Sequence, residues 1–456
     1  MSVLVAGQEV GGLVLGDEQA RALNAIADWW DVAPGVGGSQ VFRLFGYAGT
    51  GKTTVAKLVP WLLGIEGSVR FAAYTGKAAH VLARKGCEPA STIHSLIYSP
   101  IEGREPCPAG ELCPSWVWDE EPTIAHGPGA LSEGELYERA FGLLPPRRTG
   151  SCTERSHQRK TVEYVRKDVL DMGGEDGAPV ELIILDEVSM VNADLGRDLL
   201  SYGVPVLVLG DPGQLEPIGG EGFFVGRGQA DADVMLTEVH RQARESPVLR
   251  LATEVRAGQF PRSRGMAVGM DVYRRAGQIL CWRNATRWAI VETMRQAAGR
   301  PAGRPVVGDR VICLANNREL RVFNGQQFYT TGVEWIERPG PGRAGVWRLS
   351  LVDDGAQSYT IDAYPDGFES HRGEESIKRD GGRGRVAAMT FADAITVHKA
   401  QGSEWPEVVV VDEGSALEWG ANKRGEDGRT SRIRWTYTAI TRASETVHVV
   451  DAKGWR

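Results

Sequence analysis

The sequence predicts an α/β protein built on two parallel sheets, each interrupted by an inserted segment. Three observations support this prediction. Short β-branched and aliphatic runs alternate with segments of helical spacing, which is the pattern of a parallel sheet. A stretch rich in Pro, Gly and charge over residues 99–179 breaks the first alternating unit, which then resumes. A second alternating unit starts near residue 246 and is broken by short segments separated by turns.

The first unit is assigned to residues 1–98 and 180–245. Residues 99–179, acidic first and then basic over 147–167, are expected to form an inserted subdomain. The basic part either tracks a nucleic-acid backbone, covers a duplex junction or is a solvated charged linker. The apolar spacing of this unit predicts helices over 20–30, 53–63, 77–84 and 92–98, and strands over 41–45, 69–74, 182–185 and 206–209.

The second unit is assigned to residues 246–325 and 386–456. Between its halves, residues 326–385 form short alternating segments with Gly and Pro turns, which predicts a small antiparallel β-barrel. Spacing in the whole second part predicts helices over 247–256 and 285–298, parallel strands over 278–282, 408–411 and 447–450, and barrel strands over 327–335, 346–352 and 358–364.

Composition bounds the class of protein. At 456 residues the chain has room for about three domains. Its 42% hydrophobic and 24% charged residues exclude a wholly disordered or fibrous chain. With 52 Lys and Arg against 59 Asp and Glu the net charge is -7, which excludes a small basic module that grips nucleic acid by bulk charge. Any nucleic-acid site must be local.

Targeting and redox signals point to a reducing, cytoplasmic setting. The N-terminal stretch has no cationic start, and nowhere do about 18 apolar residues run together, so we expect neither secretion nor membrane association. The six cysteines form no disulfide framework. Four residues of the first insert raise the question of zinc, although their spacing fits tight zinc knuckles poorly. They are Cys107, Cys113, Cys152 and His157.

A glycine-rich loop between a predicted strand and a predicted helix carries the first chemical signal. Residues 46–53 read GYAGTGKT and fit the phosphate-loop pattern GxxxxGKT. Backbone N–H groups would surround phosphate oxygens, Lys52 would reach the β- and γ-phosphates, and the Thr53 hydroxyl would bind Mg²⁺. The expected nucleotide-binding residues are Gly46, Ala48, Gly49, Thr50, Gly51, Lys52, Thr53 and Thr54.

A strand that ends in two acids supplies what hydrolysis needs. Residues 182–187 read LIILDE, so an apolar strand delivers Asp186 to the metal and Glu187 to the attacking water. Gln214 follows the next predicted strand and is expected near the γ-phosphate. The predicted cofactors are therefore ATP and Mg²⁺.

Two arginines distinguish a motor from a switch or a kinase. Arg241 lies at the junction of the two units and Arg442 lies in the second unit. A guanidinium that stabilises charge on the transferring phosphoryl group makes hydrolysis depend on closure when it comes from another domain. With Lys52, Glu187 and Gln214 they complete the expected catalytic set.

These motifs, in this order, resemble those of superfamily 1 helicases, and within them the RecD/Dda branch (superfamily 1B). Any one motif is moderate support, whereas ten in family order span the chain. They are Gln19 in LGDEQARAL, the phosphate loop, YTGKAA (74–79), STIHSL (91–96), LDEVSM (185–190), GDPGQLEPI (210–218), LTEVHRQ (236–242), VFNGQ (322–326), TVHKAQGSEW (396–405) and YTAITRA (437–443).

The resemblance implies two RecA-like P-loop units, a β-rich SH3-like second insert, and ATP-driven 5′ to 3′ movement on single-stranded DNA. It implies that Gln19 reads adenine, Glu404 touches the nucleotide sugar, and Gly402 with Gln401 forms a nucleotide-sensing loop. The first insert of this branch carries a wedge that splits the duplex. Here that segment is long and shows no hairpin signal, so the sequence supports translocation better than strand separation.

The expected partners are single-stranded DNA and single-strand/duplex junctions, with replication or recombination proteins as further candidates, bound by a monomeric motor. Polar side chains and one cation suit phosphate oxygens without reading sequence. Trp405 and Trp435 remain unassigned. The expected strand contacts are Thr75, Lys77, Thr92 and His94 on the first unit, and Asn324, Thr396 and His398 on the second.

Three other functions compete with a helicase. A translocase would displace proteins from single strands without unwinding. A P-loop phosphotransferase leaves the second unit and Arg442 unexplained. A nucleotide-gated binding module does not need Glu187 or two arginines. No pattern of a nuclease or relaxase centre is present, so DNA cleavage is not expected.

Overall fold

The computed structural model describes most of the two alternating units and part of the first insert. The described residues are 4–32, 37–105, 116–118, 150–152, 159–170, 179–216, 222–226, 231–238, 246–261, 269–317, 319–320, 322–337, 345–353, 355–380, 386–423, 425 and 427–452.

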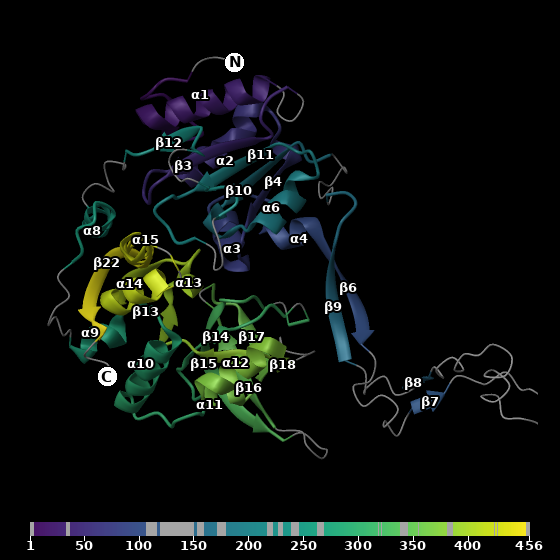
Figure 1. Cartoon of the computed structure of the whole chain (residues 1–456), viewed down its shortest axis with the longest axis vertical. Helices are drawn as coiled ribbons and strands as arrows, with labels where there is room; N and C mark the ends of the chain where they lie inside the picture. The colour runs from purple at the N-terminus through teal and green to yellow at the C-terminus, as the bar shows by residue number, and fades with distance from the viewer. Residues whose placement is uncertain are drawn as a thin grey trace, which may run out of the picture. The chain divides into compact units, whose positions relative to one another are not determined.

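The first sheet is parallel throughout, as the alternation predicted (Figure 1). Its strand order is β12-β3-β11-β10-β4-β5. The order places β3, β11 and β10 side by side, so the three motif-bearing strand ends meet at one edge. The strands are β3 (Val41–Gly46), β4 (Val69–Ala73), β5 (Ala90–Thr92), β10 (Leu182–Asp186), β11 (Val206–Gly210) and β12 (Val234–Leu236).

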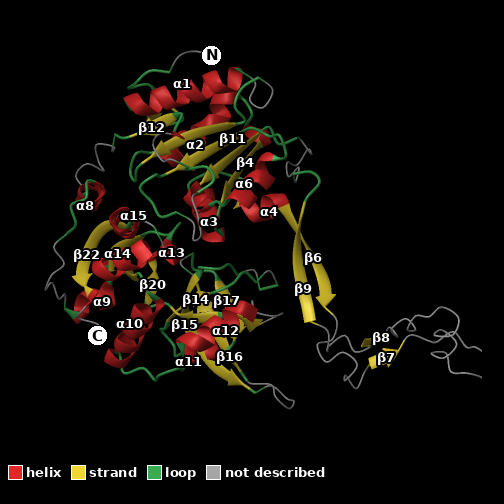
Figure 2. Cartoon of the chain, viewed as in Figure 1, coloured by secondary structure: helices red, strands yellow, loops and turns green. Residues whose placement is uncertain are grey.

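Helices cover both faces of this sheet (Figure 2). Leu23 of α1 and Val55 of α2 pack against alternate residues such as Leu44 and Ile184, because side chains of a strand alternate between its faces. Helices α3, α4 and α6 lie on the opposite face. The helices are α1 (Asp17–Asp31), α2 (Lys52–Leu63), α3 (Gly76–Arg84), α4 (Ile93–Ile97) and α6 (Ala193–Leu200).

The second sheet is also parallel, in the order β20-β13-β21-β22. Ile279 and Val409 face a core shared with α10, whereas Leu280 and Val408 face α8, α14 and α15. The elements are α8 (Pro247–Arg256), α9 (Met270–Arg275), β13 (Gln278–Cys281), α10 (Asn284–Ala297), β20 (Ala394–Thr396), α13 (Val397–Ala400), β21 (Trp405–Asp412), α14 (Gly414–Lys423), α15 (Gly428–Ile440) and β22 (Ala443–Asp451). The predicted α/β class with two RecA-like parallel sheets is confirmed.

A six-stranded sheet, β18-β17-β16-β15-β14-β19, packs on the same core as α10. All its neighbouring strands are antiparallel except β17 and β18. It includes the three strands predicted within 326–385 and extends beyond them on both sides. Its strands and adjoining helices are β14 (Arg310–Cys313), β15 (Gln327–Ile336), β16 (Val346–Val352), β17 (Ser358–Ala363), α11 (Asp366–Glu369), α12 (His371–Asp380), β18 (Val386–Ala387) and β19 (Met389–Phe391).

Residues 98–168 form a separate compact unit that contains an antiparallel ribbon. β6 (Tyr98–Glu105) pairs with β9 (Arg159–Arg166) in one unbroken register (Figure 1). The absence of a hairpin signal was therefore misleading: the paired strands lie far apart in sequence, so no short turn of the kind that marks a hairpin joins them. Part of the basic stretch is strand rather than linker. A short pair, β7 (Trp116–Trp118) with β8 (Gly150–Cys152), is also present.

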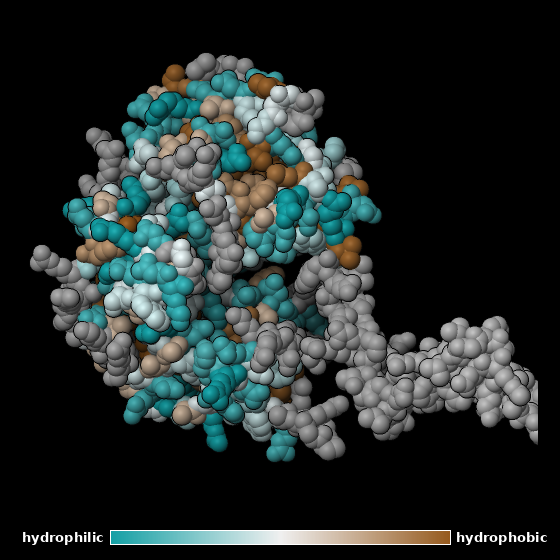
Figure 3. All heavy atoms as spheres, in the orientation of Figure 1, coloured by the Kyte–Doolittle hydropathy of each residue, from teal (hydrophilic) through white to brown (hydrophobic). Residues whose placement is uncertain are grey.

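The remaining described elements are small. They are the ribbon of β1 (Glu9–Val10) and β2 (Leu13–Val14), and the 3-10 turns η1 (Glu66–Ser68) and η4 (Val188–Met190). Among the described residues no helix has the length and apolarity needed to cross a bilayer. Polar residues predominate on the described surface seen in Figure 3.

Three cysteine side chains are described in the structure. Cys87, Cys281 and Cys313 are free and buried, and burial raises the pKa of Cys87 to about 11. No group of His, Cys, Asp and Glu within the described ranges has metal-site geometry. The zinc candidates lie outside the residues whose side chains are described.

A buried charge network joins three helices around the second core. Glu374 of α12 pairs with Arg287 of α10 and accepts hydrogen bonds from Trp288 Nε1 at 3.0 Å and Lys399 Nζ at 3.3 Å. Glu374 and Arg287 are 3% and 1% exposed. Because both charges are removed from water, each would be strongly destabilising without the other as its counter-ion.

Removing one partner should therefore be costly. Glu374→Ala leaves Arg287 buried without its counter-ion, and we expect a loss of about 3–5 kcal/mol in the free energy of unfolding, measured by urea titration. Glu375→Ala is the control on the same helix, because its side chain is 60% exposed, and it should change stability by less than about 0.5 kcal/mol. Equal losses in both variants would contradict the assignment.

Candidate nucleotide and nucleic-acid site

The phosphate loop connects β3 to α2, as predicted. Gly49 and Gly51 both have positive φ, at 77° and 83°, which side chains other than glycine adopt poorly. A Cβ on Gly46 would meet Thr50 Oγ1 at 2.6 Å. Gly51 is the N-cap of α2 and no side chain caps that helix. The loop is thus shaped by its glycines and leads into a helix N-terminus that suits an anion.

Lys52 lies within the curve of this loop. Its Nζ donates to the carbonyl oxygens of Gly46 at 2.6 Å and Tyr47 at 3.0 Å. These bonds hold the ammonium group at the position where the loop would surround phosphate oxygens.

The two acids at the end of β10 have different surroundings. Asp186 Oδ2 accepts a hydrogen bond from Thr53 Oγ1 at 3.2 Å, which brings together the two residues predicted to bind Mg²⁺. Its Oδ1 accepts from the backbone N–H of Glu187. Glu187 itself has φ of +54°. This left-handed backbone turns the chain sharply at the end of the strand. The carboxylates of Asp186 and Glu187 therefore lie in different surroundings.

Glu187 faces an arginine that follows α15 of the second unit. Arg442 Nη1 lies 3.9 Å from Glu187 Oε1. Desolvation raises the pKa of Glu187, while the Arg442 charge opposes that shift. Arg442 is 6% exposed, and its Nε donates to the Thr438 carbonyl at the end of α15. A carboxylate with a raised pKa next to a fixed guanidinium has the character of a general base paired with an electrophilic group.

The turn after β11 presents Gln214, which is 8% exposed, toward the same edge. Its backbone N–H bonds to the Asp211 carbonyl, and Asp211 Oδ1 accepts from Gly213 N at 2.9 Å. No hydrogen-bond partner is present among the described groups for the buried Gln214 Oε1. The turn therefore places an amide at the strand end, as predicted.

Gln19 lies near the start of α1 and is buried. Its Oε1 accepts from the backbone N–H of Gly16 at 3.1 Å, so the side chain caps its own helix. The neighbouring Glu18 accepts from the backbone N–H groups of Thr237 and Glu238 and from the Thr237 hydroxyl, at 2.6–2.7 Å. α1 thus holds the chain that leads toward Arg241, which lies outside the described residues.

The loop after α13 approaches the first sheet closely at Gly402. Gly402 has φ of +72°, and a Cβ there would meet Ala78 Cβ at 2.9 Å and Thr75 Oγ1 at 3.3 Å. Gln401 Nε2 donates to the Leu215 carbonyl at 3.4 Å. Glu404 is exposed at the loop's end.

The first group of expected strand contacts lies around the start of α3 and α4. Thr75 caps α3 by accepting from Ala78 N at 3.1 Å. Thr92 bonds to Ser95, and the His94 ring packs edge-on to Tyr74 with centroids 6.0 Å apart. Lys77 Nζ lies 5.0 Å from the Trp405 ring, which is a cation–π contact between the two units.

The second group is more dispersed. Asn324 is exposed in the turn before β15, and its backbone N–H donates to Asn316 Oδ1. Thr396 is 9% exposed at the end of β20, and His398 is half-buried in α13. Phe323, 45% exposed, lies beside the α3 start, where a Cβ on Gly76 would meet its ring at 2.8 Å.

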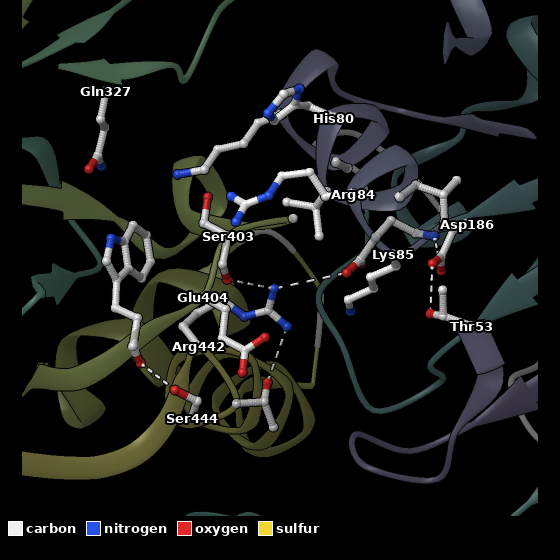
Figure 4. A pocket seen from close by; sticks show the side chains of 18 of the residues that line it. Thr53, His80, Arg84, Lys85, Asp186, Gln327, Ser403, Glu404, Arg442 and Ser444 are labelled. Carbon is white, nitrogen blue, oxygen red and sulfur yellow. Dashed lines mark hydrogen bonds and ion pairs between the residues drawn. The ribbon is translucent and has the colours of Figure 1, made fainter. Parts of the chain in front are cut away.

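Many of these residues line one cavity of about 1490 Å³. Figure 4 shows Thr53 and Asp186 bonded to one another on one side and Arg442, which follows α15, on the other. The predicted residues in its lining are Ala48, Gly49, Lys52, Thr53, Lys77, Asp186, Glu187, Gln214, Gly402, Glu404 and Arg442. The other predicted site residues that the structure describes are absent from that lining.

Sequence reasoning assigned no role to Asp211, Tyr437 or Thr438, which lie between the units. Tyr437 Oη donates to Asp211 Oδ2, and Leu215 N donates to Thr438 Oγ1 at 3.0 Å. The available signal was polar residues within the apolar end of a helix, in the motif that also holds Arg442. A single sequence does not say where such residues point.

Comparison with known protein families shows which family the chain belongs to. A family model described as an AAA domain matches residues 14–284, more than half of the chain. The chain belongs to this AAA-domain family. A second model, described as a UvrD-like helicase C-terminal domain, matches residues 391–450, which include β21, α15 and Arg442. The AAA-domain match contains the phosphate loop and both acids of β10.

Two curated proteins are similar to this AAA-domain protein. The ATP-dependent RecD2 DNA helicase of Deinococcus radiodurans is 24% identical over 87% of this chain and 45% of its own length. The RecBCD enzyme subunit RecD of Mycolicibacterium smegmatis is 26% identical over 60% of this chain and 50% of its own. The chain spans about half the length of the curated relatives it matches. The predicted membership of the RecD-like branch of superfamily 1 is confirmed.

Similar solved structures include two Pif1 helicases. Bacteroides Pif1 bound to single-stranded DNA is 18% identical, with coverage of 96% of this chain and 92% of that chain and a TM-score of 0.47. Pif1 from Candida albicans is 15% identical, with coverage of 96% and 95% and a TM-score of 0.46.

The Glu18 bridge between α1 and residues 237–238 should be measurable through its pH dependence. Burial raises the pKa of Glu18, but its hydrogen bonds to Thr237 and Glu238 outweigh this and lower it overall. A depressed pKa means that the bridge stabilises the fold above the ordinary carboxyl pKa and that this contribution disappears as the pH falls through the folded value.

We expect Glu18→Gln to lower the free energy of unfolding by about 1–3 kcal/mol at neutral pH, since charged hydrogen bonds are lost. The difference from the unsubstituted protein should shrink as the pH falls below the ordinary glutamate pKa of 4.5, measured by denaturant titration at several pH values. Asp17→Asn, an exposed neighbour in the same helical turn, is the control. A difference that stays constant with pH would rule out the bridge.

Proposed function

We propose that this protein is an ATP-dependent DNA helicase and translocase that moves 5′ to 3′ on single-stranded DNA. The observation that carries the proposal is the ion pair between Glu187, at the end of a first-sheet strand, and Arg442, which follows α15 of the second unit. Because the two groups come from different units, hydrolysis depends on how those units meet. A P-loop phosphotransferase has no use for such an arrangement.

The nucleotide site uses the residues that the sequence singled out. Backbone N–H groups of Gly46 and residues 49–54 and the Lys52 ammonium bind the phosphates, Ala48 lines the same site, and Gln19 reads adenine. The hydroxyl of Thr53 and the carboxylate of Asp186 are hard oxygen ligands that fit Mg²⁺, which when bound would neutralise phosphate charge.

The remaining catalytic roles follow from position. Glu187 orients and deprotonates the attacking water, and Gln214 senses the γ-phosphate. Arg442, together with Arg241, stabilises charge on the transferring phosphoryl group. Gly402 and Glu404 touch the nucleotide from the second unit, since their loop lies against α3.

Single-stranded DNA would bind across both units without base readout. The first unit offers Thr75, Lys77, Thr92 and His94, and the second offers Asn324, Thr396 and His398. Alternate grips by the two groups, timed by hydrolysis, would advance the strand. The proposal extends to binding of single-strand/duplex junctions and to action as a monomeric motor. It also extends to a cytoplasmic location, which the buried free thiols of Cys87, Cys281 and Cys313 support.

The polarity of movement is tested with forked duplexes that carry only a 5′ or only a 3′ single-stranded tail. We expect ATP-dependent unwinding from the 5′ tail and none from the 3′ tail. Unwinding is measured by the separation of the two strands on a gel. Lys52→Ala is the control and should lower the rate at least ~100-fold, because a positioned phosphate contact is lost. Unwinding from the 3′ tail would refute the polarity, and strand-stimulated hydrolysis without unwinding would identify a bare translocase.

The role of Arg442 is tested by steady-state ATP hydrolysis with saturating single-stranded DNA. Arg442→Ala should reduce kcat about 10³-fold, the usual contribution of an arginine that stabilises phosphoryl charge. Arg429→Ala, at an exposed position near the start of the same helix, should leave kcat within about twofold. Similar effects in the two variants would indicate that Arg442 acts only through helix stability.

A further inference from the structure

We infer that Tyr437 is a positioning residue for strand-stimulated hydrolysis. It couples the seating of α15, by which we mean the packing of this helix against the first unit, to the phosphate loop and to the turn that carries Gln214. This inference rests on the proposed function, and it concerns a residue that contacts neither nucleotide nor strand in that proposal.

The Tyr437 hydroxyl is bonded on both sides by groups of the first unit. It accepts a hydrogen bond from the backbone N–H of Ala48, in the phosphate loop, at 2.9 Å. It donates to Asp211 Oδ2 at 2.8 Å. One oxygen atom of the second unit thus joins the loop after β3 to the turn after β11.

The surroundings keep this hydroxyl neutral and poorly replaceable by water. Tyr437 is 1% exposed and Asp211 is 4% exposed. Burial and the neighbouring Asp211 charge raise the pKa of Tyr437 well above its ordinary value. The phenol therefore stays protonated and donates, and it stabilises a carboxylate whose other oxygen is bound by Gly213 N at 2.9 Å.

The ring is held as closely as the hydroxyl. A Cβ on Gly213 would meet Tyr437 ring carbons at 3.0 and 3.2 Å and Asp211 Oδ1 at 3.2 Å, so a side chain there would crowd the ring. The Tyr47 ring packs edge-on to Tyr437, with centroids 6.4 Å apart. The geometry fits one seated position of the helix rather than a sliding contact.

Neighbouring residues of α15 bind the same turn. Thr438 Oγ1 accepts from Leu215 N, and Arg434 pairs with Glu216. Arg442 follows at the end of the helix, beside Glu187. Seating of α15 therefore sets the phosphate loop, the Gln214 turn and the arginine together.

Loss of the hydroxyl affects only the seated arrangement. With Phe at 437, the Ala48 N–H and an Asp211 oxygen remain buried without a partner while α15 is seated, but both are hydrated when it is not. The seated population falls, and with it the turnover of bound ATP. ATP binding to the first unit is retained, so kcat should fall and KM should change little.

The test measures ATP hydrolysis by Tyr437→Phe with saturating single-stranded DNA. We expect kcat to fall about tenfold, KM for ATP to stay within about twofold, and the melting temperature to stay close to that of the unsubstituted protein. Tyr202→Phe is the matched control, because the Tyr202 hydroxyl donates to the Ile97 carbonyl at 2.9 Å within the first unit. It should leave kcat unchanged. Gly213→Ala, which displaces the ring without altering Tyr437, should reproduce the lower kcat.

A double variant separates coupling from a general defect. If the two side chains act through one bond, adding Tyr437→Phe to Asp211→Ala should reduce kcat by less than about threefold further. Independent multiplication of the two losses, an unchanged kcat in Tyr437→Phe, or an equal loss in Tyr202→Phe would overturn the inference. Absence of strand stimulation in the unsubstituted protein would instead overturn the proposed function itself, and this inference with it.

Discussion

The alignment of three neighbouring parallel strands is the constraint on which the rest of the molecule depends. Because β3, β11 and β10 are adjacent and run the same way, the phosphate loop, the Gln214 turn and the two acids leave the sheet at one edge. The hydrogen bond from Thr53 to Asp186 is a direct result of that arrangement. No single residue could supply this chemistry, since each group would be solvated and mobile without the buried apolar strands that deliver it.

The electrostatics of the site follow from what surrounds that edge. The chain carries a net charge of -7, yet Lys52 and Arg442 lie in the cavity with Asp186 and Glu187. Partial removal of water raises the pKa of Glu187, and the neighbouring Arg442 charge opposes that shift. Elsewhere, buried charges stabilise the fold, since Glu374 of α12 pairs with residues of α10 and α13. Net charge is thus a poor guide to local potential in this protein.

The sequence was sufficient for features that depend on local pattern. Apolar spacing located the longer strands of both parallel sheets but missed the three-residue strands β5, β12 and β20. The glycines at 49 and 51 identified a loop that requires positive φ. It was insufficient for contacts that join distant segments. β6 and β9 pair without a short turn between them, so no hairpin signal exists. Nor does any local pattern indicate that Tyr437 reaches Ala48, because that contact depends on how the second sheet packs against the first.

Coupling between the units can be traced to the rigidity of one helix. Trp435, Tyr437 and Ile440 of α15 are buried in the core of the second sheet, so the helix does not move independently of that sheet. The polar groups of Tyr437 and Thr438 nevertheless bind the first unit. Packed cores do not deform continuously, so displacement of the second sheet breaks these contacts together and withdraws Arg442 from Glu187 in the same step. Such concerted loss is what the proposed ATP-driven motor would require.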